Sequence, residues 1–68
     1  MSYILKDVAA KSIRAKYKNS YISEKLGLSG SYVSLVLNRR RAIPKHVAYS
    51  FTKIISSDAE IKDLFEQV

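Results

Sequence analysis

The most constraining feature of the sequence is Gly27, one of only two glycines, which separates two stretches with the apolar spacing of helices. Ile22 and Leu26 precede it, and Val33 and Val36 follow it. Glycine adopts at little cost the left-handed conformation that ends many helices, and the chain can turn sharply there. The sequence therefore predicts two short helices joined at Gly27, with their apolar sides facing a common core.

Apolar residues recur at helical spacing along the whole chain, and no stretch alternates persistently between apolar and polar residues. We therefore predict an all-α fold, a compact five-helix bundle that forms a single domain over residues 1–68. The expected helices run from about Tyr3 to Tyr17, from Asn19 or Ser20 to Leu26, from Ser29 to Asn38, from Pro44 to Ile55 and from Ser57 to Val68. The expected inward residues of the first helix are Leu5, Val8, Ala9, Ile13 and Tyr17, and those of the fourth are Val47, Phe51, Ile54 and Ile55.

Two local signals support the last two helix starts. Pro44 suits the first position of a helix, where its missing N–H costs nothing. Ser57 and Glu60 have the spacing of a capping box.

The size and composition of the chain exclude several classes of protein. A chain of 68 residues buries only about 60% of its unfolded surface and has no room for a large active-site cavity. Without cysteine, neither a disulfide framework nor a thiolate metal site is expected. The apolar runs are far shorter than the roughly 20 residues that cross a bilayer, and the N-terminus lacks the order of a signal peptide. We expect a cytoplasmic protein.

Positive charge is concentrated in the first four fifths of the chain. The formal net charge is +6, and residues 1–56 hold 11 of the 12 lysines and arginines but only two acids, a balance of +9. Residues 57–68 hold one lysine against four acids, a balance of −3. A positive field attracts nucleic acid or an anionic membrane surface, or simply keeps a protein in solution. A membrane partner is not expected, because no helix pairs a strong apolar face with a uniformly basic one.

Ser23, Gly27 and Val33 have the spacing of a helix-turn-helix and resemble that motif in the Cro/CI (Xre) family of phage and bacterial repressors. In that family a small residue lies early in the first helix, a glycine lies at the turn, and a branched apolar residue follows six positions later. The small residue is usually alanine, so Ser23 fits if its hydroxyl bonds back to the preceding turn. The resemblance covers about Leu5 to Ile55.

The residues after the motif extend the resemblance. Asn38, the arginines at 39–41 and Pro44 match the asparagine, polar turn and proline that often follow the second helix of the motif. The resemblance implies a protein that binds double-stranded DNA at an operator.

In such a motif the second helix enters the major groove with its N-terminal residues at the base edges. Val33, Val36 and Leu37 cluster on one side of this helix, so the opposite side is expected to meet DNA, with Tyr32 at the border between core edge and DNA. The predicted base-reading residues are Gly30, Ser31, Tyr32, Ser34 and Leu35. Family members commonly carry long amides where this chain has Gly30 and Ser31, so bidentate reading of adenine is excluded there and DNA shape becomes important.

Two groups of residues flank the reading helix and are predicted to contact phosphates. One group lies at the N-terminus of the preceding helix, whose free N–H groups and dipole favour an anion. The other follows the reading helix, and at least one of its three consecutive arginines is expected to point away from DNA. The predicted phosphate contacts are Lys18, Asn19, Ser20, Tyr21, Asn38, Arg39, Arg40, Arg41 and Lys45.

Other residues of types that often bind metals or act in catalysis lack the partner residues that these roles require. His46 is the only histidine, with no second histidine or cysteine to share a metal, and no serine has a plausible base. We therefore expect no metal, cofactor, small-molecule ligand or enzymatic activity. The five tyrosines are scattered over different expected helices, which favours packing at the core edge over stacking on single-stranded bases.

The last expected helix has an apolar stripe with two alternative roles. Ile61, Leu64, Phe65 and Val68 either close the core of the monomer or pair with their copies in a second subunit. Small members of the family often dimerise through C-terminal elements, and a dimer would place two reading helices about 34 Å apart on one face of DNA.

The sequence thus predicts a sequence-specific transcriptional repressor of Cro/Xre type that binds a near-palindromic operator. It is expected to be a homodimer at least when it is bound to DNA. The alternative is a protein-interaction module, such as an antitoxin, whose C-terminal stripe binds another protein while its DNA binding is autoregulatory.

Overall fold

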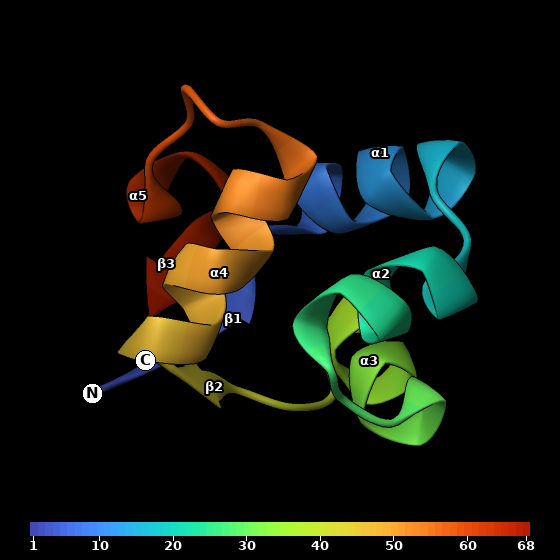
Figure 1. Ribbon diagram of the computed structural model, residues 1–68. Helices are drawn as coiled ribbons and strands as arrows, with labels where there is room; N and C mark the ends of the chain where they lie inside the picture. The colour runs from blue at the N-terminus through green and yellow to red at the C-terminus, as the bar shows by residue number, and fades with distance from the viewer.

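The computed structural model describes all 68 residues and shows a mixed α/β fold, so the predicted all-α bundle is wrong. In chain order the elements are β1 (Ser2–Leu5), α1 (Asp7–Lys16), α2 (Asn19–Leu26), α3 (Gly30–Leu37), β2 (Ile43–Pro44), α4 (Lys45–Ile55), α5 (Ile61–Leu64) and β3 (Phe65–Gln67). In Figure 1, α4 lies in front of the strands, and α2 and α3 lie together on the other side of the molecule.

A three-stranded antiparallel sheet joins the two ends of the chain. The strand order is β2-β1-β3, with Tyr3 opposite Ile43 and Leu5 opposite Phe65. The predicted first helix is wrong over its first turn, because the aromatic and branched residues before Lys6 pair with two distant strands instead. Val8, expected to face inward, lies in α1 and is 79% exposed.

The predicted helix over residues 57–68 is also wrong. Its capping box lies three residues later than expected, with Glu60 as N-cap and its backbone N–H donating to Asp63 Oδ2 at 2.8 Å. The helix ends at Leu64, because the next residues pair with β1. Phe65 is buried there, and its ring meets that of Phe51 edge-on at 5.6 Å between centroids.

The hydrophobic core draws on every element except α5. Eleven apolar residues are buried, from Leu5 in β1 to Phe65 in β3, and Thr52 is the only buried polar residue. The Thr52 hydroxyl donates to the Ala48 carbonyl at 2.8 Å, which satisfies it without a partner from another element. The inward side of α4 is therefore Ala48, Phe51 and Thr52, while the other residues expected there are half-buried.

Pro44 is the N-cap of α4 and not the predicted first helical residue, because the helix begins at Lys45; Pro44 also belongs to the edge strand β2. An edge strand tolerates proline because no neighbouring strand needs its missing N–H. The two ends of the chain lie close together, since the Val68 N–H donates to the Ser2 carbonyl at 2.9 Å (Figure 1). None of the helices combines the length and the apolar character that a bilayer crossing would require.

Candidate nucleic-acid interface

The turn between α2 and α3 has the geometry that Gly27 predicts. Gly27 adopts φ 69° and ψ 28°, and the Leu28 N–H donates to the Ser23 carbonyl at 3.0 Å, the pattern of a Schellman motif. The Ser23 hydroxyl donates to the Ser20 carbonyl at 3.1 Å, which confirms the bond to the preceding turn. Ser29 caps α3, because its side chain accepts from the Tyr32 N–H at 3.1 Å.

The two sides of α3 differ as the helical spacing predicts. Val33, Val36 and Leu37 are buried against the core. On the other side Gly30 and Ser31 are exposed, and Leu35 is 38% exposed. The first turn of α3 therefore presents backbone, a hydroxyl and a branched apolar side chain to solvent.

The N-termini of α2 and α3 lie side by side. A Cβ atom added at Gly30 would lie 3.6 Å from Asn19 Oδ1, so the Asn19 amide flanks the start of α3. No side chain caps the N-terminus of α2 at Lys18, which leaves its first N–H groups available to an anion. Two helix N-termini thus converge on the surface predicted to meet DNA.

A shallow hollow of about 220 Å³ continues this surface between α1, α2 and α3. Ser34 is half-buried there rather than fully exposed, and the Asn38 amide donates to its carbonyl at 2.8 Å. Asn38 thereby caps the C-terminus of α3 as well as lining the hollow. Tyr17 and Asn19 complete the rim on the side of α2.

Arg14 is a residue of this surface that the sequence does not reveal. Its Nη1 donates to the Leu37 carbonyl at the C-terminus of α3, where a cation also complements the helix dipole. Arg14 also lines the hollow. No local signal identifies it, because its partner lies 23 residues away.

The three consecutive arginines have different surroundings. Arg39 adopts φ 58°, and its Nε donates to the Leu5 carbonyl at 2.8 Å while Nη2 lies 4.0 Å from a Glu66 oxygen. Arg41 lies over the Tyr32 ring at 5.2 Å. The Arg40 side chain is exposed and takes part in none of these contacts.

The positions of Arg39, Tyr32 and Lys45 show which of the residues predicted to meet DNA are engaged elsewhere in the protein. Arg39 is bound to the sheet, so its guanidinium is already engaged within the protein. Tyr32 is half-buried beneath Arg41, so it lies at the core edge. Lys45 lines a different surface, between α4 and the sheet.

The N-terminal group of predicted phosphate contacts stays together. Lys18 and Ser20 are exposed, and Tyr21 is 44% exposed with its ring stacked on Tyr17 at 5.8 Å between centroids. Lys25 lies 5.7 Å from the centre of the Tyr21 ring and adds a cation nearby.

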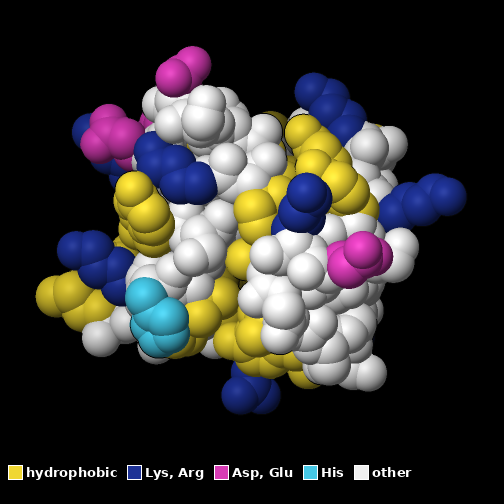
Figure 2. Space-filling model, in the orientation of Figure 1, with side chains coloured by type: hydrophobic (Ala, Val, Ile, Leu, Met, Phe, Trp, Pro, Cys, Tyr) yellow, Lys and Arg dark blue, Asp and Glu magenta, His cyan; other side chains and the backbone are white.

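The charge of the two ends of the chain separates in space as well as in sequence. In Figure 2 the acidic side chains gather mainly at the upper left, over α5 and the loop before it, whereas lysines and arginines are spread around the rest of this face. The acidic segment therefore lies apart from α2 and α3.

The C-terminal apolar stripe is mostly used within the monomer. Phe65 is buried, and Ile61 and Leu64 are half-buried against the core. Only Val68, which is 67% exposed, remains largely free for a second subunit. Within one chain, the first three residues of the stripe therefore pack on or in the core.

Comparisons of the chain with protein-family models, with curated proteins and with solved structures found no match.

Proposed function

We propose that this protein is a sequence-specific double-stranded DNA-binding repressor of Cro/Xre type. The observation that carries the proposal is the exposed first turn of α3, at Gly30 and Ser31, which lies beside the uncapped N-terminus of α2. A helix presented in this way fits the major groove, while the neighbouring N–H groups fit a phosphate. The chain would act in a bacterial or phage-infected cytoplasm, as a dimer on a near-palindromic operator, without cofactor or catalysis.

Base reading and phosphate binding divide among different residues in this proposal. Ser31 offers a short hydroxyl to a base edge, and Leu35 offers an apolar surface to a thymine methyl group. Gly30 adds no bulk, so the start of α3 can approach the base edges closely. Lys18 and Arg40 supply cations on either side of α3 and position the protein without reading sequence.

The alternative of a protein-interaction module built on the C-terminal stripe has less support. Such a module needs an exposed apolar surface, but Phe65 lies in the core and Ile61 and Leu64 pack against it.

The proposal predicts a clear preference for one duplex sequence. Duplexes that bind the protein are selected from a random pool, and the affinity for the selected duplex is compared with that for a scrambled duplex of the same composition. Specific binding of this kind typically exceeds nonspecific binding by a factor of about 10³ or more. A ratio near one would remove the claim of specificity.

Single substitutions then separate the two kinds of contact. Ser31→Ala is expected to change the preferred sequence, whereas Arg40→Ala is expected to weaken all duplexes alike and to reduce the salt slope by about 1 for each bound subunit. Arg39→Ala is a matched control, because its guanidinium is engaged by Leu5 and Glu66, and it is expected to leave the slope unchanged. Equal effects of the three variants on every duplex would contradict this division.

A further inference from the structure

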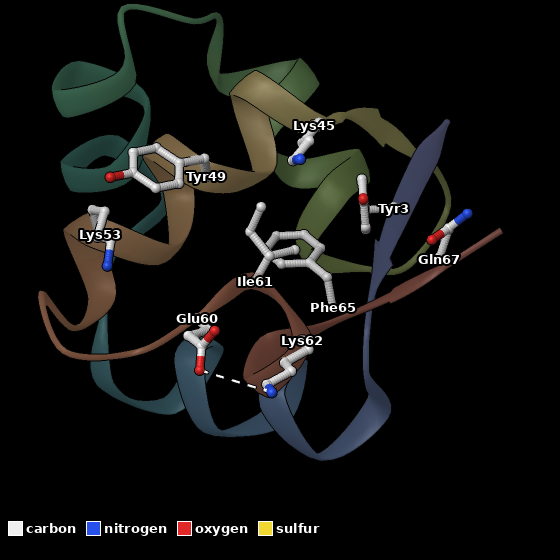
Figure 3. Close-up of a pocket in the computed structure, with 9 residues that line it drawn as sticks. All are labelled: Tyr3, Lys45, Tyr49, Lys53, Glu60, Ile61, Lys62, Phe65 and Gln67. Carbon is white, nitrogen blue, oxygen red and sulfur yellow. Dashed lines mark ion pairs between the residues drawn. The ribbon is translucent and has the colours of Figure 1, made fainter.

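A groove between α4 and the sheet carries three lysines around an apolar floor. Lys45 and Lys53 reach it from α4 and Lys62 reaches it from α5, and its volume is about 550 Å³. Figure 3 shows Ile61 and Phe65 at the centre of the groove, with the lysines around them. No residue between 19 and 38 lines the groove, so this surface is distinct from the exposed side of α3.

The fold brings together two tyrosines that lie far apart in the sequence. Tyr3 comes from β1 and Tyr49 from α4, and both line the groove (Figure 3). Tyr49 is 56% exposed, and Lys53 Nζ lies 5.4 Å from the centre of its ring.

The Lys53 ammonium is held in a fixed position at the edge of the groove. Its Nζ donates to the Ser57 carbonyl at 3.1 Å and to the Ala59 carbonyl at 3.0 Å. An ammonium has three donors, so one remains for a further acceptor. Because its position is already fixed, binding an anion there costs little side-chain entropy.

The charges of the groove favour an anion of extended shape. The groove is lined by three lysines and by one carboxylate, that of Glu60. A Glu60 oxygen lies 3.8 Å from Lys62 Nζ, and this ion pair is exposed. Lys45 and Lys53 are two helical turns apart on α4, which corresponds to about 12 Å along the helix axis. One phosphate or carboxylate cannot reach both, whereas about four residues of an extended peptide span that length.

We propose that this groove binds an extended acidic peptide segment of a partner protein. An apolar side chain of the peptide rests on the half-buried Ile61, and its carboxylates meet the ammonium groups of Lys45, Lys53 and Lys62. The Gln67 amide, which also lines the groove, offers a donor and an acceptor to the peptide backbone. The proposal does not depend on DNA binding, because the two surfaces share no residue of α2 or α3.

An acidic peptide fits these features better than single-stranded nucleic acid does. Base stacking needs an open aromatic face, but Lys53 already lies over the ring of Tyr49. The apolar part of the groove instead contains the half-buried Ile61, which suits a branched side chain. Competition by a single strand is therefore an outcome that distinguishes the two ligands.

The probe is a blocked nine-residue peptide with two central leucines flanked by glutamates. Binding is followed by backbone amide shifts of the isotope-labelled protein and by fluorescence anisotropy of the labelled peptide at low salt. We expect saturable binding, with shifts at Tyr3, Tyr49, Ile61 and Gln67 and none along α3. Replacing both leucines by serine is expected to weaken binding about tenfold, because the apolar contact is lost.

Two matched double variants separate the groove from general attraction to a basic protein. Tyr49→Ser with Lys62→Gln removes a tyrosine and a charge from the groove and is expected to weaken peptide binding about tenfold while duplex binding is kept. Tyr21→Ser with Lys25→Gln removes the same residue types from α2 and is expected to change peptide affinity by less than about twofold.

Three results would overturn the proposal. Equal loss of peptide affinity in both double variants would show attraction by net charge alone. Shifts confined to residues outside the groove would place the peptide elsewhere. Displacement of the peptide by an oligothymidylate of lower dissociation constant would make the groove a nucleic-acid site. Failure of sequence-specific duplex binding would leave the groove proposal intact, since the duplex and peptide readouts are independent.

Discussion

Two residues with positive φ end the helices on either side of the candidate interface. Gly27 is the C-cap of α2, and Arg39 follows Asn38, the C-cap of α3; both adopt the left-handed region. Both ends have Schellman hydrogen bonds, with the Arg40 N–H donating to the Leu35 carbonyl at 2.9 Å in the second case. Glycine adopts this conformation freely, whereas Arg39 is held in it by its bonds to the sheet.

Gly27→Ala is expected to lower the free energy of unfolding by about 1–2 kcal/mol, because a Cβ atom is strained at this φ even where space is open. The measurement is urea denaturation of both proteins. Gly30→Ala is the control, since its Cβ would make only an ordinary contact at 3.6 Å, and replacing glycine by alanine within a helix is expected to leave the stability unchanged or to raise it. Equal losses in the two variants would contradict the conformational explanation.

At the scale of elements, the C-terminal segment shows how pairing overrides helical spacing. Ile61, Leu64, Phe65 and Val68 have the spacing of an amphipathic helix, yet the helix ends at Leu64 and a strand follows. The strand is stabilised by antiparallel pairing with β1 and by burial of Phe65 against Phe51. Neither partner is near in the sequence, and helical spacing alone does not reveal them.

Phe65→Leu is expected to lower the free energy of unfolding by about 1–2 kcal/mol, because the smaller side chain fills the core less well. Val68→Ala is expected to cost less than about 0.5 kcal/mol, since Val68 is 67% exposed. Both are measured by urea denaturation at several protein concentrations. A larger loss for Val68→Ala that grows on dilution would instead place the stripe in a dimer interface.

At the scale of the whole molecule, size limits how one subunit can meet DNA. Its principal extents are 25 × 22 × 20 Å, shorter than the roughly 34 Å between successive major grooves on one face of DNA. In the proposed function, one subunit would therefore present α3 to a single groove, and a near-palindromic operator would require two subunits. This requirement concerns the complex and does not demand a dimer in free solution.

The salt dependence of binding is expected to report the number of subunits. A dimer with about ten phosphate contacts predicts a slope of log K against log salt near −9 on a full operator. A half-operator that binds one subunit is expected to give about half that slope. Both are measured by titration over a series of salt concentrations, and equal slopes for the two duplexes would contradict a dimeric complex.

Sequence alone determined the local features of this protein. The bounds of α2 and α3, the left-handed Gly27, the Ser29 cap and the buried side of α3 all depend on residues within a few positions of each other. Helical spacing and capping chemistry act over that distance and can therefore be recognised in the sequence. The exposed first turn of α3 follows from the same signals.

Only the tertiary structure decided the sheet, the contacts of Arg39 and Arg41, and the groove beside α4. Tyr3 pairs with both Ile43 and Gln67, Arg14 donates to Leu37, and Arg39 donates to Leu5. These contacts join residues far apart in the chain, and their free energy is gained only when the core has brought the segments together. The physical reason is that strand pairing and side-chain direction depend on distant partners, whereas helical spacing does not.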